Sequence, residues 1–166
     1  LMSNNRKDGR NSAYPNYPKP VITQYASPEK ELEGILARIQ MEDLDDVAIL
    51  VPSDKEVMMV NDYLAKHGVK TQVMYRTGNT VPFRTVNTLD FSNNDLPCIL
   101  TYYAAKGSEF DNVFVPFANT SNDCSRNSFY VACTRSSRSL YISYSGTKTK
   151  YLSDVNSDFI TELKAA

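Results

Sequence analysis

The feature that most constrains the fold is a run of five apolar residues, Val-Ala-Ile-Leu-Val, at positions 47–51. A strand with one face in water alternates apolar and polar residues, whereas a continuous apolar run is typical of a strand covered on both faces. Such strands belong to parallel sheets with helices on both sides, connected by right-handed crossovers. The run therefore predicts an α/β fold with a mainly parallel sheet flanked by helices.

The residues around this run predict two strand–helix pairs. Residues 21–25 alternate as a strand does, and Ser27 caps a helix that has proline at its first position and ends near Glu42. A Ser-x-x-Glu pattern starting at Ser53 predicts a capping box for the second helix, which Gly68 is placed to end.

The remaining elements follow from shorter apolar runs. Residues 81–91 fit a helix, a strand or a hairpin, and we leave these alternatives open. Residues 1–19 are polar and interrupted by prolines, which predicts a flexible segment. It leads into one domain over residues 20–166. We expect the chain to be a fragment of a longer protein. The predicted strands are 70–75, 98–103, 113–117 and 140–144, and the predicted helices are 126–136 and 155–163.

Composition narrows the class of protein. The 166 residues are 42% hydrophobic and 22% charged, which is ordinary for one soluble domain, and no apolar run approaches the roughly 20 residues that span a bilayer. We therefore expect no membrane partner and a cytoplasmic location. Three cysteines without a C-x-x-C pair and a single histidine argue against a disulfide framework and against a metal site.

The charge is unevenly distributed although the net charge is only −1. Positions 21–100 carry 7 basic and 12 acidic side chains, whereas positions 101–150 carry 6 basic and 3 acidic ones. The positive excess in the second region suits a polyphosphate or a nucleic-acid backbone as partner.

Two segments of this basic region place polar side chains beside apolar runs. The first, TYYAAKGSEFD at 101–111, has a glycine where a strand ends, Gly107, and then a carboxylate, Glu109, which we place at a carboxyl edge of the sheet. The second, YVACTR at 130–135, has an apolar half for the core and an exposed tip that ends in Arg135. A guanidinium is always protonated and offers a planar fork of donors that fits phosphate.

In this order the two segments resemble the fifth and sixth motifs of the UvrD/Rep-like superfamily 1 helicases, ATP-driven motors that walk on single-stranded nucleic acid. The resemblance implies the C-terminal motor domain of such a protein, a three-layer RecA-like domain. Gly-Ser-Glu-Phe-Asp is closest to the compact RecD-like branch, whereas many members carry His at the position of Tyr103 and Leu at that of Ser108.

The resemblance also implies roles for particular residues. Arg135 is implied as a catalytic arginine finger, Gly107 and Glu109 as further nucleotide contacts with Glu109 on the ribose, and Thr101, Tyr103 and Lys106 as contacts to single-stranded DNA. The implied cofactor is ATP with Mg²⁺, bound mainly by the first motor domain of the same polypeptide. This sequence has no G-x-x-x-x-G-K-[ST] loop and no Asp-Glu pair that closes a strand. We therefore expect the chain alone to be inactive as an ATPase.

Two alternatives belong to other functional classes. The chain could be a non-catalytic nucleic-acid-binding or partner-docking module of helicase shape, or an unrelated nucleotide-binding domain of the flavodoxin type. The choice between DNA and RNA also stays open at the level of sequence.

Overall fold

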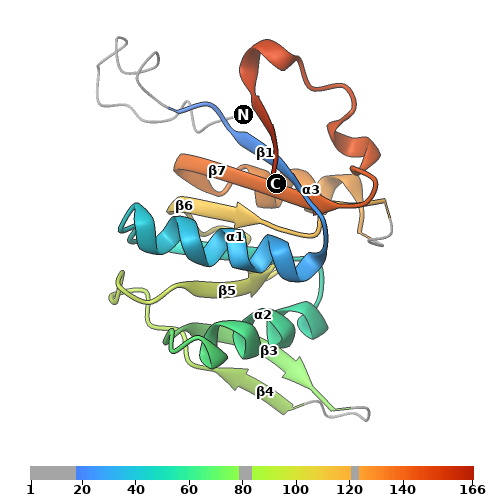
Figure 1. Cartoon of the computed structure of the whole chain (residues 1–166). Coiled ribbons are helices and arrows are strands. Elements are labelled where there is room, and N and C mark those ends of the chain that lie inside the picture. The colour runs from blue at the N-terminus through green and yellow to red at the C-terminus, as the bar shows by residue number, and fades with distance from the viewer. Residues whose placement is uncertain (1–17, 79–83, 121–123) are drawn as a thin grey trace, which may run out of the picture.

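The computed structural model describes residues 18–78, 84–120 and 124–166, so most of the predicted flexible segment lies outside the described residues. The described residues form one eight-stranded sheet with α-helices on both of its faces (Figure 1). The predicted α/β class with a mainly parallel sheet is confirmed.

The sheet has the strand order β4-β3-β5-β2-β6-β7-β1-β8. Every neighbouring pair is parallel except β3 and β4, which are antiparallel. The strands are β1 (Val21–Tyr25), β2 (Val47–Val51), β3 (Gln72–Thr77), β4 (Arg84–Asn87), β5 (Cys98–Thr101), β6 (Phe110–Val115), β7 (Ser136–Ser145) and β8 (Thr161–Lys164).

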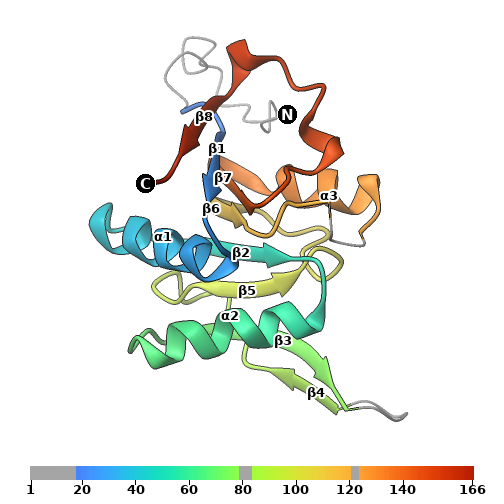
Figure 2. The same cartoon turned by 45° about the vertical axis from the view of Figure 1, so that its right-hand side comes forward.

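Helices α1 (Pro28–Met41) and α2 (Asp54–Lys66) cover one face of the sheet, and α3 (Arg126–Cys133) lies on the other face (Figure 2). The alternation of the central strand β2 divides the core in two. Its first, third and fifth residues pack with α1 and α2, and its second and fourth pack with α3. All five residues of β2 are fully or almost fully buried, as the continuous apolar run predicts.

The predicted helix ends are largely confirmed. The Ser27 hydroxyl accepts a hydrogen bond from the backbone N–H of Lys30 at 3.2 Å, and Gly68 follows α2 with a φ of +76°. The capping box predicted at Ser53 is wrong. The Ser53 hydroxyl does not accept from the Glu56 N–H but donates to the Glu56 carboxylate at 2.9 Å. The carbonyl of Ser53 accepts from the Glu56 N–H, so the hydroxyl is not needed there.

The predicted last helix over 155–163 is wrong. The chain forms a short 3₁₀ helix at Ser157–Phe159 and then the strand β8, whose four residues are exposed. β8 pairs in parallel with β1, and the Thr161 N–H and Ala165 N–H donate to carbonyls of Pro20 and Gln24. A helix here would leave that edge of β1 without backbone partners, which is why the strand is favoured.

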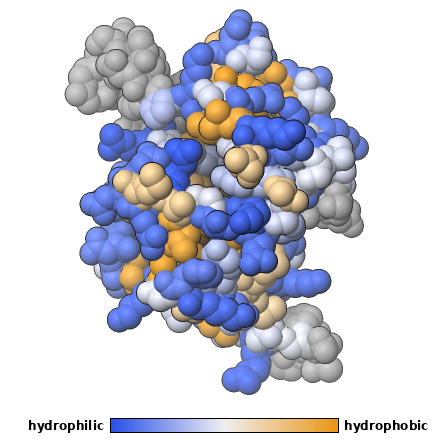
Figure 3. Space-filling view, viewed as in Figure 1, coloured by the Kyte–Doolittle hydropathy of each residue, from blue (hydrophilic) through white to orange (hydrophobic). Residues whose placement is uncertain are grey.

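Within residues 81–91 the structure describes one strand, β4, which pairs antiparallel with β3, so the strand alternative is confirmed for the described residues; residues 79–83 lie outside them. The strand predicted over 98–103 already ends at Thr101. Hydrophilic side chains cover much of the face that carries α1 and α2, with apolar patches between them (Figure 3). None of the described helices is both long and apolar enough to cross a membrane.

Candidate functional site

The predicted site residues lie on two opposite edges of the parallel sheet. We call the edge where β2, β5 and β6 end the carboxyl rim, and the edge where they begin the amino rim. Thr101 is the last residue of β5 and lies on the carboxyl rim. Glu109 and Arg135 directly precede β6 and β7, so both lie on the amino rim.

Residues 102–109 cross the sheet from the carboxyl rim to the amino rim. These eight residues connect the parallel strands β5 and β6, which flank β2, although such connections usually need a dozen residues or more. The crossover is short because it packs tightly: Tyr102 and Ala105 are buried with α3, and the Tyr102 ring meets Phe129 edge-on at 6.3 Å. Gly107 has a φ of +80°, which favours glycine at this turn.

The crossover overturns one prediction from the sequence. The sequence predicts Glu109 at a carboxyl edge of the sheet, because it follows the β5 run closely along the chain. It lies at the amino rim instead, because the chain has already crossed the sheet before Glu109.

The carboxyl rim brings together the three residues predicted to contact DNA. The Thr101 hydroxyl accepts from the Ala104 N–H at 3.1 Å and so holds the first turn of the crossover. Tyr103 is 81% exposed, although the neighbouring Tyr102 is buried. The Lys106 ammonium lies 5.5 Å from the centroid of the Tyr103 ring, within cation–π range. The rim therefore presents an exposed ring beside a positive charge.

On the amino rim the Arg135 side chain is half-buried and held by its own chain. Its Nε donates to the Val131 carbonyl at 3.0 Å, Nη1 to the Ser108 carbonyl at 3.4 Å, and Nη2 to the Thr134 hydroxyl at 3.1 Å. The contact with Ser108 places the guanidinium next to Glu109. Bonds to described residues use three of the five N–H groups of this guanidinium, and the other two could face a ligand such as a phosphate.

Carboxylates surround the same rim. The Asp46 carboxylate accepts from the Asp111 N–H at 2.9 Å, and the Ser137 hydroxyl donates to Asp111 at 2.7 Å. Burial raises the pKa of Asp46, and the nearby charges of Asp111, Asp45 and Glu109 raise it further against that hydrogen bond. The amino rim thus combines one fixed guanidinium with several oxygen acceptors, which suits a ligand that has both phosphates and hydroxyl groups.

One buried carboxylate was missed from the sequence. Glu31 of α1 is completely buried and accepts from the Phe117 N–H at 2.8 Å, the Ser143 hydroxyl at 2.8 Å and the Ser145 hydroxyl at 3.2 Å. Phe117 has a φ of +63°, a conformation that non-glycine residues rarely adopt, and the hydrogen bond from its N–H helps to hold it. The signal was present, because Glu31 lies one turn before Ile35 on the apolar stripe of its helix.

The comparisons with known proteins bear on both rims. Residues 97–143 match the family described as UvrD-like helicase C-terminal domain, a segment that holds Thr101 and Arg135 and the whole crossover. The predicted resemblance to UvrD-like helicases is confirmed. No curated protein matches the chain.

A solved structure has the same fold. It is the crystal structure of the C-terminal domain of a possible DNA helicase from Lactobacillus plantarum WCFS1, with a TM-score of 0.70 and 22% identity. The alignment covers 88% of this chain and 86% of that one. At this identity the similarity shows the fold alone, an α/β fold that the two chains share.

Proposed function

We propose that the chain is the second motor domain of an ATP-dependent DNA helicase, with nucleotide contacts on the amino rim and single-stranded DNA on the carboxyl rim. The observation that carries the proposal is the crossover 102–109. One end of this short, packed segment holds Tyr103, and the other end leads to Glu109 and to the Arg135 guanidinium, which bonds to Ser108.

On the amino rim Arg135 acts on the nucleotide. ATP with Mg²⁺, held mainly by the first motor domain, supplies the phosphoryl group that is transferred to water. The two guanidinium N–H groups that no described residue accepts from would bond to a γ-phosphate, whose negative charge grows during transfer. The carbonyls of Val131 and Ser108 keep the guanidinium in place, so little side-chain freedom is lost when phosphate binds. Glu109 is available to accept a hydrogen bond from a ribose hydroxyl.

On the carboxyl rim Tyr103 contacts an unpaired base and Lys106 its backbone. Base stacking on an exposed aromatic ring contributes about 1–3 kcal/mol per base and tolerates any sequence, which suits a motor that moves along DNA. Because Tyr103 and Ser108 belong to one packed segment, a shift on one rim is transmitted to the other. Closure against the first motor domain would in this way be coupled to the grip on the strand.

The test is the substitution Arg135→Ala in the full-length polypeptide. We expect DNA-stimulated ATP turnover to fall by about 10³-fold or more, as for other arginine fingers, with little change in the Kd for ATP. Steady-state hydrolysis with and without oligonucleotide gives the first quantity, and titration with a fluorescent nucleotide gives the second.

Arg138→Ala is the matched control, because Arg138 is exposed on β7 only three residues away. We expect it to leave turnover within about twofold. Unchanged turnover in Arg135→Ala would show that Arg135 is not an arginine finger. A full-length protein that binds single-stranded DNA but hydrolyses no ATP would favour the non-catalytic module instead.

A further inference from the structure

A groove of about 580 Å³ opens on the carboxyl rim beside Tyr103. One side is formed by the end of β5 and the start of the crossover, and the other by the hairpin of β3 and β4; Pro52, Ser53 and Asp54, between β2 and the start of α2, also line the groove. A volume of this size is in the range of pockets that hold small molecules, roughly 300–1,000 Å³. Thr101 and Tyr103 line the first side, and Met74, Tyr75, Arg76 and Thr85 line the second.

Tyr103 separates this groove from a second, smaller hollow of about 80 Å³. The small hollow is lined by Lys106 and by Asn127 and Ser128 of the first turn of α3. An extended chain that crosses the carboxyl rim over Tyr103 therefore meets the cationic Lys106 side first and the groove next.

Arg76 gives the groove a positive group at its far wall. Its side chain is 67% exposed, and Nε lies 3.8 Å from a carboxylate oxygen of Asp54, which also lines the groove. An exposed ion pair of this length contributes little to stability. A phosphate in the groove could therefore compete with Asp54 for the guanidinium.

We propose that the hairpin of β3 and β4 forms the second wall of a nucleotide subsite next to Tyr103. In this subsite the groove holds one unpaired nucleotide adjacent to the one stacked on Tyr103, with its base against Met74 and Tyr75 and its phosphate on Arg76. An aromatic and apolar lining that includes a cation, Arg76, with Lys106 in the hollow on the other side of Tyr103, has the chemistry of single-strand binding sites. The inference rests on the proposed contact of this rim with single-stranded DNA.

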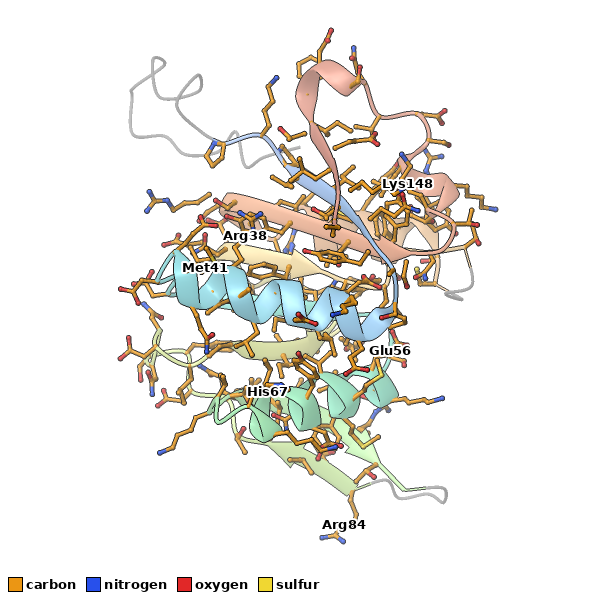
Figure 4. The ribbon with its side chains drawn as sticks, in the orientation of Figure 1. Arg38, Met41, Glu56, His67, Arg84 and Lys148 are labelled. Atoms are coloured by element: carbon orange, nitrogen blue, oxygen red, sulfur yellow. The ribbon has the colours of Figure 1, made fainter. Side chains whose placement is uncertain are left out.

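The test compares Arg76→Gln with Arg84→Gln in this 166-residue chain. Both arginines lie on the hairpin, but Arg84 does not line the groove and points away from the body of the molecule (Figure 4). Binding of fluorescein-labelled oligo(dT) is measured by anisotropy over a series of salt concentrations. We expect Arg76→Gln to weaken binding roughly threefold to tenfold and to lower the slope of log K against log salt by about 0.7, the value for one phosphate on a single strand. Arg84→Gln should change the affinity less than about twofold.

Tyr103→Ala separates this inference from the proposed function. If Tyr103→Ala weakens binding while Arg76→Gln behaves like Arg84→Gln, the subsite is overturned and the DNA contact of the rim stands. If wild-type chain does not bind oligo(dT), both are overturned. A salt slope that falls equally in Arg76→Gln and Arg84→Gln also contradicts the subsite, because it indicates a diffuse charge effect.

Discussion

The two rims of the sheet both carry predicted site residues but are built differently. On the carboxyl rim Tyr103 is 81% exposed beside a lysine and a wide groove. On the amino rim Arg135 is half-buried and donates three hydrogen bonds to its own chain. A long, sliding polymer needs an open surface, whereas a reaction at one phosphate needs a donor held in one place. The exposed Tyr103 thus suits the proposed DNA contact, and the half-buried Arg135 suits the proposed contact with a phosphate.

The two rims also depend on one another. The crossover 102–109 belongs to both, and its packing under α3 keeps its two ends at a fixed separation. Substitutions that loosen this packing should disturb both rims, and substitutions at either end should disturb only one. The following predictions test this, in order of the size of the expected effect.

The largest effect is expected from Tyr102→Ala, compared with Tyr103→Ala. Tyr102 is 3% exposed and packs on Phe129, so its truncation should lower the free energy of unfolding by about 3–5 kcal/mol. Tyr103→Ala should change it by less than about 0.5 kcal/mol, because that ring is in water. Urea denaturation followed by circular dichroism measures both. Equal losses in the two variants would show that the crossover is not anchored as described.

The next effect concerns the buried carboxylate of Glu31. Glu31→Ala leaves the Phe117 N–H and two serine hydroxyls without their acceptor, and we expect a loss of roughly 2–4 kcal/mol in the free energy of unfolding. Chemical denaturation of the wild type and the variant at neutral pH gives the difference. A loss below about 1 kcal/mol would mean that water replaces the carboxylate without difficulty.

The substitution Glu31→Gln tests how the free energy of unfolding depends on pH. Burial raises the pKa of Glu31 from its ordinary 4.5, against the hydrogen bonds that it accepts. The folded chain therefore keeps the proton to a higher pH than the unfolded chain does. The contribution of this group to stability falls as the pH rises from about 4.5 through the raised value. Glu31→Gln should remove that part of the pH dependence. Identical pH profiles for the two proteins would contradict the assignment.

The smallest effect is expected at the turn of the crossover. Gly107 and Gly146 have φ values of +80° and +74°, and neither has an atom within 4 Å of where a Cβ would lie. Alanine at either position should therefore cost about 1–2 kcal/mol of backbone strain. Only Gly107→Ala should also weaken oligo(dT) binding, because Gly107 follows Lys106 directly. Equal oligo(dT) binding by the two variants would show that the turn at Gly107 does not affect the DNA contact.

Much of the fold could be predicted from local patterns. The five apolar residues of β2, the capped start of α1 and the glycine that follows α2 are each determined by neighbours along the chain. The last strand, β8, could not be predicted, because residues 161–164 carry little local preference. Hydrogen bonds to β1, more than a hundred residues away, decide their conformation.

The sequence predicts which residues belong to the candidate site, but it does not predict how they are arranged on the sheet. Thr101, Tyr103 and Lys106 share the carboxyl rim, as their common segment suggested. Glu109 is on the other rim, since eight residues are enough to cross this sheet when they pack as tightly as Tyr102 and Ala105 do. Arg76 was missed because it is distant in sequence from both motifs and becomes a neighbour of Tyr103 only through the strand order of the sheet.

The sequence by itself determined the residue types and their order: buried strands, a glycine turn, a tyrosine beside a lysine, and an arginine after a short helix. These depend on local propensity and on apolar periodicity, which act over a few residues. Only the tertiary structure decided that Arg135 and Tyr103 lie on opposite rims and that the β3–β4 hairpin faces Tyr103. Both arrangements depend on strand pairing between distant segments, whose hydrogen bonds and burial are not encoded in any one stretch of the chain.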